Sequence, residues 1–567
     1  MSLTSGDVVE MATGITVLVG PNNAGKSLIL RDIRDYVANG PQAHSPFKAV
    51  GKVKLAYSGT SMEFFDRLKR FHGIREPGVY PQGTFHEPHV IIEGQVVTVG
   101  LIGNFWNIER PVGPFAAQVL RLLDATGRLS VPLAGVRWNP YREVPSTPVQ
   151  RLFASRDLEA KISSYMMRAF GMPLTVHRYN GNEIILHVGV VEAIETVEPA
   201  SLGYLNEIWS LPLWADQGDG VRAFLGVLLT LMTADYPIVM VDEPEAFLHP
   251  PQAQLLGRLL VEILENGTQV IVATHSADII DGITAAAASA SNVSIARVTR
   301  SKDGNKVAQV SPMKLRKLYD DPLIKYYNVL DGLFSSGVVL CEADSDCTYY
   351  RAVLDTLGTL ESGTPAQSVS THFTHCGGKD RLPKAVGALR SANVPVACIV
   401  DIDFLQNDRD FEALVLAYDG DPSEYRSWRN VVTSAINQKT QKPMRAAVQA
   451  EMQVLFADAR SGPLTSGERT KISNVISGTS GWKEFKKSGR SCLSGEAVSA
   501  FDRLTSALRT LGIFVVELGE LERFHPEIRS ENKAFWLRNV IECGLYRDSS
   551  EAKKLVSAII ESIAGAQ

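Results

Sequence analysis

The feature that most constrains this chain is a glycine-rich stretch between an apolar run and a helix-like segment. Residues 20–27 read Gly-Pro-Asn-Asn-Ala-Gly-Lys-Ser, after the apolar run 15–19 and before the helix-like segment 28–36. A strand, a glycine-rich loop and a helix in this order form a phosphate-binding P-loop, because backbone N–H groups and the helix N-terminus then face the anion. The alternative is a strand–helix turn that binds no nucleotide.

Within this loop, two side chains have predicted chemical roles. Lys26 is expected to reach the β- and γ-phosphates, and the Ser27 hydroxyl is expected to ligate Mg²⁺. The residues predicted to bind the nucleotide from this loop are Asn23, Gly25, Lys26 and Ser27.

Two later apolar runs end in residues that a P-loop site needs. The run 237–241 leads into Asp242 and Glu243. We expect Asp242 to hold Mg²⁺ through a water, and Glu243 to polarise the attacking water. The run 268–273 ends at Thr274-His275-Ser276, one helix and one parallel strand later, so His275 is read as a γ-phosphate sensor. The alternative for all three is ordinary hydrogen bonding at strand ends.

A second glycine loop precedes an apolar helix. Residues 216–220 read Asp-Gln-Gly-Asp-Gly, and the apolar segment 221–232 follows. A glycine-flanked loop that opens a helix can bind an anion, so Gly218 and Gly220 are candidate nucleotide contacts. An ordinary glycine helix start is the equally simple alternative.

These four pieces, in this order, resemble the ABC-type ATPases, specifically the branch with SMC/Rad50-like heads. The resemblance implies that ATP binds with Mg²⁺, and that two heads dimerise so that the glycine loop of one closes on the ATP of the other. The usual signature has Ser where this chain has Gln217, so the contacts expected to survive are the backbone contacts of Gly218 and Gly220. The sequence does not distinguish a Q-loop glutamine.

The second half of the chain contains a separate group of acids. The apolar run 338–340 ends in Cys341-Glu342, and Asp346 follows at the start of a helix-like segment. The run 395–400 ends in Asp401-Ile402-Asp403. Acids at the ends of neighbouring parallel strands converge on one crevice. They repel one another unless a divalent cation neutralises them, and oxygen-only ligands suit Mg²⁺ or Mn²⁺. Solvated acids without a metal are the alternative.

This pattern resembles a TOPRIM domain, in which Glu342 matches the family glutamate and Asp401 with Asp403 matches the DxD motif. The family glycine after the glutamate is Ala343 here. The acid further on, often Glu in TOPRIM nucleases, is Asp346.

Near the C-terminus, residues 515–522 repeat the theme of a strand followed by acids. They resemble the late motif that supplies a second metal site, with Glu522 favoured over Glu520. Lys533 is a candidate for charge stabilisation, although a surface lysine is the simpler interpretation.

An ABC-type ATPase followed by a TOPRIM domain resembles the layout of the OLD (overcoming lysogenization defect) family of nucleases, whose relatives include the nuclease subunit of Gabija antiphage systems. The resemblance implies an ATP-regulated, metal-dependent DNA nuclease in prokaryotic antiphage defence, which forms a homodimer or higher homo-oligomer and allows a second defence-system protein as partner. The catalytic residues it implies are Glu243, His275, Glu342, Asp401, Asp403 and Glu522. The metal ligands it implies are Ser27, Asp242, Glu342, Asp346, Asp401, Asp403, Glu520 and Glu522.

Two other functions compete with this interpretation. One is a TOPRIM topoisomerase or primase, but no tyrosine-bearing cleavage domain or primase zinc module is evident. The other is an ATP-dependent sensor or scaffold, whose inactive TOPRIM domain only recruits a partner effector. The departures at Ala343 and Asp346 keep this second alternative open.

Composition limits the compartment and the partners. The 567 residues predict two to four domains, and the net charge of −5 means that any DNA contact must come from local patches. The six cysteines form no Cys-x-x-Cys pair, and neither a signal segment nor an apolar run of about 18 residues is present. We therefore expect a cytoplasmic protein with no membrane partner. The candidate basic clusters are Lys483, Lys486, Lys487 and Arg490, and separately Lys314, Arg316 and Lys317.

We expect an α/β fold in two parts. Residues 1–333 form the ABC-type ATPase domain, with a helical or dimerisation insertion within 102–200. Residues 334–567 form the TOPRIM domain, with a helical insertion at about 412–505. Inside the first part, the sequence predicts strands over 52–57, 89–92 and 95–101 and helices over 114–127 and 155–170.

Overall fold

The structure is a computed structural model of the whole chain. It describes residues 1–566 apart from 41–47, 57–58, 81–82, 93–94, 107–111, 134, 137–138, 140–142, 197–199, 234–235, 267, 288–291, 302–303, 322–327, 361–369, 441–443, 458–462, 478–479 and 529–531.

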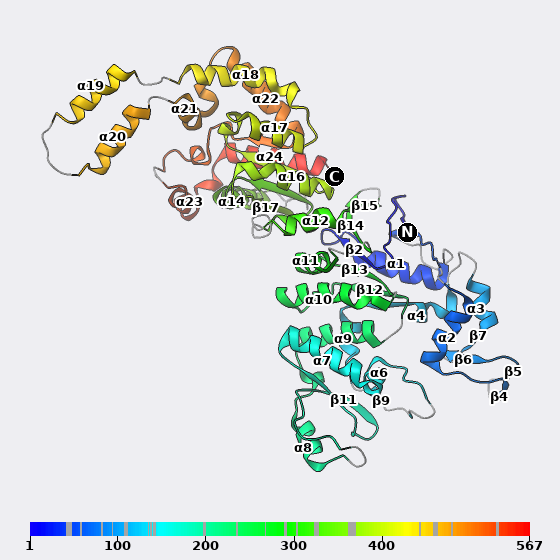
Figure 1. The fold of residues 1–567 in the computed structure, drawn as a ribbon. Coiled ribbons are helices and arrows are strands. Elements are labelled where there is room, and N and C mark those ends of the chain that lie inside the picture. The colour runs from blue at the N-terminus through cyan, green and yellow to red at the C-terminus, as the bar shows by residue number, and fades with distance from the viewer. Residues whose placement is uncertain are drawn as a thin grey trace. The chain divides into compact units, whose positions relative to one another are not determined.

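The chain folds as two compact units, Met1–Lys317 and Leu318–Gln567 (Figure 1). Each unit contains one mainly parallel sheet with helices packed on it. The predicted domain boundary near residue 333, and the two predicted insertions, stay predictions.

Unit 1 is built on a six-stranded sheet in the order β15-β14-β2-β13-β12-β8. All neighbouring strands are parallel except the β14–β15 hairpin. All five residues of β2 are buried, as expected for a strand covered on both faces. The strands are β2 (Ile15–Val19), β8 (Leu120–Leu123), β12 (Ile238–Asp242), β13 (Gln269–Ala273), β14 (Val293–Ser301) and β15 (Gly304–Val310).

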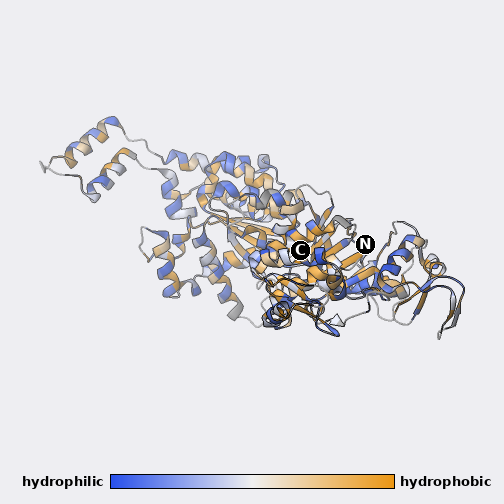
Figure 2. Ribbon diagram, turned by 60° about the horizontal axis from the view of Figure 1, so that its bottom comes forward, coloured by the Kyte–Doolittle hydropathy of each residue, from blue (hydrophilic) through white to orange (hydrophobic). Residues whose placement is uncertain are grey.

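Four longer helices pack with this sheet: α1 (Lys26–Asn39), α9 (Asp219–Thr233), α10 (Pro250–Glu262) and α11 (Ala277–Ala286). Helices α10 and α11 approach closely, because Gly257 and Gly282 lie where any Cβ would collide with the backbone of the other helix. The buried strands stand out as apolar in Figure 2.

The first part of the chain contains further helices and short strands. They are β1 (Ser2–Leu3), β3 (Val50–Lys52), α2 (Ser61–His72), β4 (Gly78–Tyr80), β5 (Gly83–Phe85), β6 (His89–Ile92), β7 (Gln95–Thr98), α3 (Val99–Trp106), α4 (Ala116–Val119), α5 (Ala125–Ser130), β9 (Gly135–Val136), α6 (Pro148–Ala154), α7 (Arg156–Phe170), β10 (Leu174–His177), β11 (Glu183–Val188), α8 (Leu202–Ser210) and α12 (Pro312–Tyr319).

Three local predictions in this part were wrong. One is the strand over 52–57, since β3 ends at Lys52 and residues 53–56 form no strand. The other two concern apolar runs. The segment 114–127, predicted as one helix, contains α4 and then strand β8, which pairs with β12 in the central sheet. The predicted strand 95–101 ends at Thr98, where α3 begins. In both places a short apolar run fits either element, and sheet pairing decides which one forms. The predicted helix over 155–170 is confirmed as α7.

Unit 2 is built on a four-stranded parallel sheet in the order β17-β16-β18-β19. The strands are β16 (Gly337–Cys341), β17 (Thr371–His375), β18 (Val396–Val400) and β19 (Ile513–Val515). The chain runs from β16 outward to β17 and then back to the other side of β16, so the order reverses between β16 and β18. In such sheets, this reversal opens a crevice beyond the carboxyl ends of the two strands.

The helices of unit 2 are α14 (Asp344–Leu360), α16 (Leu382–Ser391), α17 (Asp408–Ala417), α18 (Pro422–Gln438), α19 (Arg445–Leu455), α20 (Ser466–Ser477), α21 (Gly481–Ser488), α22 (Glu496–Leu511), α23 (Lys533–Glu542) and α24 (Ser550–Gly565). Most of them pack around this sheet, whereas α19 and α20 pair with each other and project away from it (Figure 1).

A buried aromatic group joins α14 to the C-terminal part of unit 2. The Tyr349 hydroxyl lies 3.0 Å from Nε2 of His525, and Trp536 donates from Nε1 to the His525 carbonyl at 3.3 Å. Tyr349 and Tyr350 are 0% and 1% exposed, so both are core residues. They therefore cannot act as the accessible nucleophile of a topoisomerase.

Throughout the described ranges, no helix combines the length and apolarity needed to cross a bilayer.

We predict that the stability of unit 1 depends on pH through His177 at the end of β10. His177 is fully buried beside His187 and Trp209, and neither of its ring nitrogens has a described partner. Burial, with a smaller contribution from His187, lowers its pKa from 6.5 to about 4. Between these two pKa values, His177 is protonated in the unfolded chain but neutral in the folded chain. The free energy of unfolding therefore falls as the pH drops from about 6.5 toward about 4.

The His177→Phe variant keeps an aromatic ring against Trp209 and removes the titration. Its melting temperature should fall less than that of the unmodified protein between pH values of about 7 and about 5. His249→Gln changes an exposed histidine and serves as the matched control. Equal acid sensitivity of the His177→Phe variant and the unmodified protein would contradict the prediction.

Candidate functional site

The P-loop takes the conformation that its glycines allow. Gly20 has φ 141, Asn23 has φ 63 and Gly25, at the N-terminus of α1, has φ 89. A Cβ on Gly20 would collide with the Val298 carbonyl, and a Cβ on Gly25 would meet the Asn305 side chain. Strand β14 and hairpin strand β15 therefore press against the loop, and only glycine fits at these two positions.

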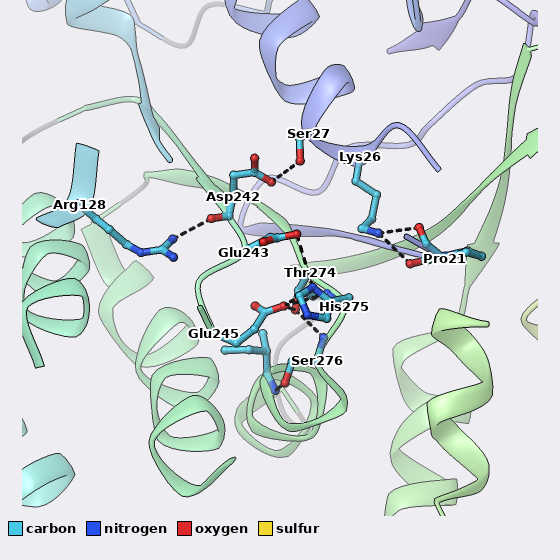
Figure 3. Close-up of polar contacts among 12 residues, drawn as sticks. Pro21, Lys26, Ser27, Arg128, Asp242, Glu243, Glu245, Thr274, His275 and Ser276 are labelled. Atoms are coloured by element: carbon cyan, nitrogen blue, oxygen red, sulfur yellow. Dashed lines mark hydrogen bonds and ion pairs between the residues drawn. The ribbon is translucent and has the colours of Figure 1, made fainter. Parts of the chain in front are cut away.

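Lys26 bonds back to the loop that precedes it. Its ammonium group donates to the carbonyls of Gly20 at 2.8 Å and Pro21 at 2.9 Å (Figure 3). Burial lowers the pKa of Lys26, and the nearby Glu243, Glu245 and Asp242 oppose that shift. Among the described residues this buried ammonium group donates to neutral carbonyls, and it is well placed to donate to phosphate oxygens instead.

Ser27 and Asp242 meet directly. The Ser27 hydroxyl donates to Oδ1 of Asp242 at 2.9 Å, although the two residues are 215 positions apart (Figure 3). Burial raises the pKa of Asp242, while the bond from Ser27 opposes the rise. The structure thus brings together the hydroxyl and carboxylate that the sequence predicted around one Mg²⁺ ion, and both supply the oxygen ligands that Mg²⁺ prefers.

Glu243 and His275 lie at the ends of adjacent strands. Nδ1 of His275 is 3.6 Å from Oε1 of Glu243, and the Glu243 N–H donates to the Ala273 carbonyl at 2.8 Å. Glu243 has φ 49, a left-handed conformation that glutamate rarely adopts. Its side chain is 46% exposed, so solvent reaches the carboxylate.

Sequence reasoning missed Glu245, which organises this edge. Its Oε1 accepts from the Thr274 hydroxyl at 2.8 Å and the His275 N–H at 2.9 Å, and lies 3.2 Å from Nδ1 of His275 (Figure 3). Burial raises the pKa of Glu245, and these hydrogen bonds oppose the rise. Its place two residues after Glu243 was the only sequence signal.

Sequence reasoning also missed Arg128 of α5. This side chain is fully buried and donates from Nη1 to the Asp242 carbonyl at 2.7 Å. Its Nε and Nη2 have no partner among the described residues. Burial lowers the pKa of Arg128, and Glu245, Asp242 and Glu243 oppose this. Arg128 lies far from these acids in the sequence, just after the segment 114–127 that was wrongly predicted as one helix.

The second glycine loop packs against the segment after β12. Gly218 precedes α9 and Gly220 lies in its first turn. A Cβ on Gly220 would collide with the Phe247 carbonyl oxygen, whereas one on Gly218 would meet open space. Gln217 donates from Nε2 to the Leu213 carbonyl at 2.9 Å. In the described chain, neither glycine hydrogen-bonds to the P-loop of the same subunit.

In unit 2, the acids gather at the carboxyl ends of β16 and β18. Oε1 of Glu342 accepts from the Asp401 N–H at 3.1 Å. Burial is the main cause that raises the pKa of both carboxyl groups, and nearby acids add to it: Asp403 and Asp346 for Glu342, and Glu342 and Asp346 for Asp401. The structure therefore brings together the four acids predicted from the TOPRIM resemblance.

Three lysines pair with these acids. Lys379 lies 3.5 Å from Oδ2 of Asp403. Lys486 of α21 lies 3.0 Å from Oδ2 of Asp403 and 3.9 Å from Oδ2 of Asp401. Lys533, the first residue of α23, lies 2.8 Å from Oδ1 of Asp346. Burial lowers the pKa of Lys486 and of Lys533, but the nearby acids together outweigh it and raise both pKa values overall. Sequence reasoning placed Lys486 only in a general basic cluster.

The late acids reach the same crevice through a tight turn after β19. The Ile402 N–H donates to the Gly519 carbonyl at 3.0 Å, which ties this turn to the Asp401–Asp403 segment. Glu520 pairs with Arg523 at 3.2 Å and raises the pKa of Lys486, while Glu522 raises that of Lys533. Both acids thus act on the lysines that neutralise the other carboxylates.

The donor chemistry of this crevice fits a hard divalent cation. All candidate ligands are carboxylates, and Oδ1 of Asp403 is buried without a described partner. Within the described ranges, however, no three His, Cys, Asp or Glu side chains stand at metal-binding distances. Lys379, Lys486 and Lys533 place positive charge beside these carboxylates.

We predict that the two glycines of the second loop differ in their tolerance of a side chain. Gly220→Ala should destabilise the protein by about 1–3 kcal/mol, because the new Cβ must push the Phe247 carbonyl away. Gly218→Ala, which meets open space, is the matched control and should leave the melting temperature within error. Thermal unfolding of both variants measures the difference, and equal melting temperatures would contradict the prediction.

Comparison with protein families identifies both parts of the chain. Residues 210–281 match the model of an AAA domain described as "putative AbiEii toxin, Type IV TA system". Residues 333–403 match the TOPRIM domain of overcoming lysogenization defect protein-like proteins. These ranges contain Asp242, Glu243 and His275 in the first part, and Glu342 with Asp401–Asp403 in the second.

Individual relatives add to this. The chain is 28% identical over 174 residues to the Old nuclease of Escherichia phage P2, a match that covers 30% of this chain and 28% of that protein. Among solved structures, an SMC head bound to the C-terminal winged-helix domain of ScpA is 17% identical, with a TM-score of 0.32 over 55% of this chain and 94% of that chain. The SMC head domain from Thermotoga maritima is 13% identical, with a TM-score of 0.26 over 53% and 92%.

The strand order of the two sheets and the two family models confirm the predicted fold class, an α/β ATPase domain followed by an α/β TOPRIM domain. The chain therefore combines an AAA-type ATPase domain with a TOPRIM domain like that of overcoming lysogenization defect (OLD) proteins, and part of it is similar to the Old nuclease of phage P2.

Proposed function

We propose that this protein is an ATP-regulated, divalent-metal-dependent DNA nuclease that acts in prokaryotic antiphage defence. The observation that carries the proposal is the convergence of Glu342, Asp401 and Asp403 where the strand order of the unit 2 sheet reverses. Buried acids with raised pKa values in such a crevice are typical of a site that gains a cation. The similarity of this chain to the Old nuclease of phage P2 supports the same activity.

In the ATPase unit, Lys26 and the P-loop N–H groups would bind the phosphates of ATP, and Ser27 with Asp242 would hold its Mg²⁺. Glu243 would orient the attacking water, since its carboxylate is accessible at the strand end. His275 would contact the γ-phosphate, with Glu245 fixing the ring through Nδ1. Arg128 would support Asp242 from behind through its backbone carbonyl.

In the TOPRIM unit, Glu342, Asp401 and Asp403 would hold one Mg²⁺ or Mn²⁺ ion, and the candidates for a second are Asp346, Glu520 and Glu522. The ions would activate water and stabilise the leaving oxygen of a phosphodiester. Lys486 and Lys533 would turn from the acids to the phosphate, because a cation in the crevice takes over their present role.

The proposed partners are DNA and a second copy of this chain. Lys483 and Lys487 of α21 make no ion pair with a described residue, so they are free to contact a phosphate backbone near Lys486. Arg490 is paired with Asp502. In the other predicted cluster, Arg316 pairs with Asp281 at 3.6 Å, and the side chains of Lys314 and Lys317 lie outside the described residues.

Dimerisation of the ATPase units through Gly218 and Gly220, the cytoplasmic location and a second defence-system protein belong to the same proposal. Each follows from the family layout.

A second candidate function is an ATP-dependent sensor or scaffold with an inactive TOPRIM domain. The observation that favours it is that Lys486 and Lys533 form ion pairs with the acids, which gives these carboxylates a structural role. In that case the carboxylates would serve only to hold α21 and α23 in place.

A DNA-cleavage assay separates the two functions. Supercoiled, linear and single-stranded DNA are incubated with the full-length protein and Mg²⁺ or Mn²⁺, with and without ATP. We expect cleavage that Asp401→Asn abolishes, because the substitution removes one ligand charge while keeping the side-chain size. The variant should remain folded, since burial already disfavours the ionised form of Asp401. The lanes with ATP give the sign of its regulation.

Asp355→Asn, an exposed acid of α14, is the matched control and should cleave normally. Cleavage that survives in Asp401→Asn would place the activity elsewhere. If no condition gives cleavage, while Asp401→Asn retains phage protection in cells, the scaffold function is correct instead.

The ATPase proposal has its own test. Glu243→Gln should lower steady-state ATP hydrolysis by about 100-fold or more, because the amide cannot accept a proton from water, while ATP binding persists. Lys26→Ala should abolish binding itself. Fluorescent ATP-analogue binding and phosphate release distinguish the two effects, and normal hydrolysis by Glu243→Gln would refute the assigned role.

A further inference from the structure

Unit 1 contains a large cavity far from the residues assigned above. Its volume is about 1170 Å³, slightly above the range of roughly 300–1,000 Å³ that is typical of pockets for small molecules and cofactors. It is lined at one side by residues that begin the central strands, namely Thr13 before β2, Ile238 in β12 and Gln269 in β13. The P-loop, Asp242 and His275 follow the opposite, carboxyl ends of these strands. The cavity is therefore a separate site.

The wall of the cavity is largely aromatic. The rings of Phe64 and Trp106 lie 5.3 Å apart, and those of Phe105 and Phe115 meet edge to face at 5.7 Å. These side chains come from α2, α3 and the segment before α4, which lie together beyond the end of α1 in Figure 1. Ring atoms that face the cavity lack dispersion contacts on that side, and a flat apolar molecule in the cavity would supply them.

The charged side chains around the cavity are mostly cationic. Lys54, Arg67, Arg70 and Arg151 line it, and Glu63 is the one acidic side chain among the described lining residues. Oε2 of Glu63 already accepts from the Thr60 N–H at 2.7 Å, as part of the cap of α2. The excess of positive charge is therefore not balanced within the lining.

Two of the arginines differ in what they can offer to a ligand. Arg151 already has partners within the protein. It donates to the carbonyls of Pro145 and Thr233, and its Cζ lies 3.8 Å from the centroid of the Phe71 ring. Arg70 is exposed and makes no hydrogen bond or ion pair with any residue that the structure describes. A free guanidinium at the rim of an aromatic cavity binds an anionic group that an apolar body carries inward.

We propose that this cavity is a binding site for a small amphipathic anion, with a planar apolar body and one carboxylate, sulfonate or phosphate group. The body lies against Phe64, Trp106 and Phe105, and the anion pairs with Arg70, with Arg67 adding positive charge to the lining. The inference does not rest on the proposed nuclease function, because it uses no residue of either candidate site.

The test uses two dyes that differ only in charge. 1-Anilinonaphthalene-8-sulfonate carries the anion, and N-phenyl-1-naphthylamine is its neutral analogue. We expect saturable binding of the anionic dye to the full-length protein, with energy transfer from Trp106 that the Trp106→Phe variant reduces. Combining Arg70→Gln with Arg67→Gln should lower the affinity for the anionic dye by about tenfold or more, and should leave the affinity for the neutral dye unchanged.

Two further variants complete the design. Thr13→Trp adds bulk at the lining and should reduce the affinity for both dyes, whereas Arg168→Gln, an exposed arginine of α7 outside the lining, should change neither. Because Arg70 is exposed, its substitution leaves the fold intact even if Thr13→Trp does not. The absence of saturable binding, unchanged affinity in the arginine double variant, or displacement of the anionic dye by ATP would overturn the proposal.

Discussion

Burying an ionised carboxylate costs several kcal/mol unless a positive charge or hydrogen-bond donors lie beside it. Both candidate sites of this chain depend on that constraint. In unit 1, Asp242 and Glu245 sit near Lys26 and Arg128 at the ends of parallel strands. In unit 2, Lys486 and Lys533 hold the acids that follow β16 and β18. Each sheet thus tolerates its acidic edge because helices bring cations to it from elsewhere in the sequence.

The same arrangement makes both edges responsive to ligands. A lysine that neutralises a carboxylate is released when a divalent cation takes its place, and a released lysine has to move its helix or find another anion. Lys486 lies in α21 and Lys533 begins α23. If a divalent cation replaced these lysines as the partner of the carboxylates, both helices would lose an ion pair. In unit 1, the described hydrogen bonds of the Lys26 ammonium group go to two loop carbonyls. A phosphate can take the place of these carbonyls, and because they are neutral, no charged group then loses its partner.

Local sequence was enough to predict the strand-end acids and the P-loop, because each motif is a short run whose geometry follows from one strand and one turn. It could not predict Arg128 or Lys486. These residues reach their partners through packing between segments more than 80 positions apart, and a lone cation in a helix carries no local signal. Strand β8 was missed for a related reason, since its four residues become a strand only by pairing with β12.

The left-handed backbone of Glu243 has a consequence for how this protein can change. Holding a glutamate at φ 49 costs about 1–2 kcal/mol relative to an ordinary conformation, whereas glycine adopts that angle freely. Glu243→Gly would therefore relieve strain and, judged by folding alone, count as an improvement. A search for more stable variants would therefore select this substitution and remove the accessible carboxylate. At this position, higher folding stability and retention of the carboxylate are incompatible.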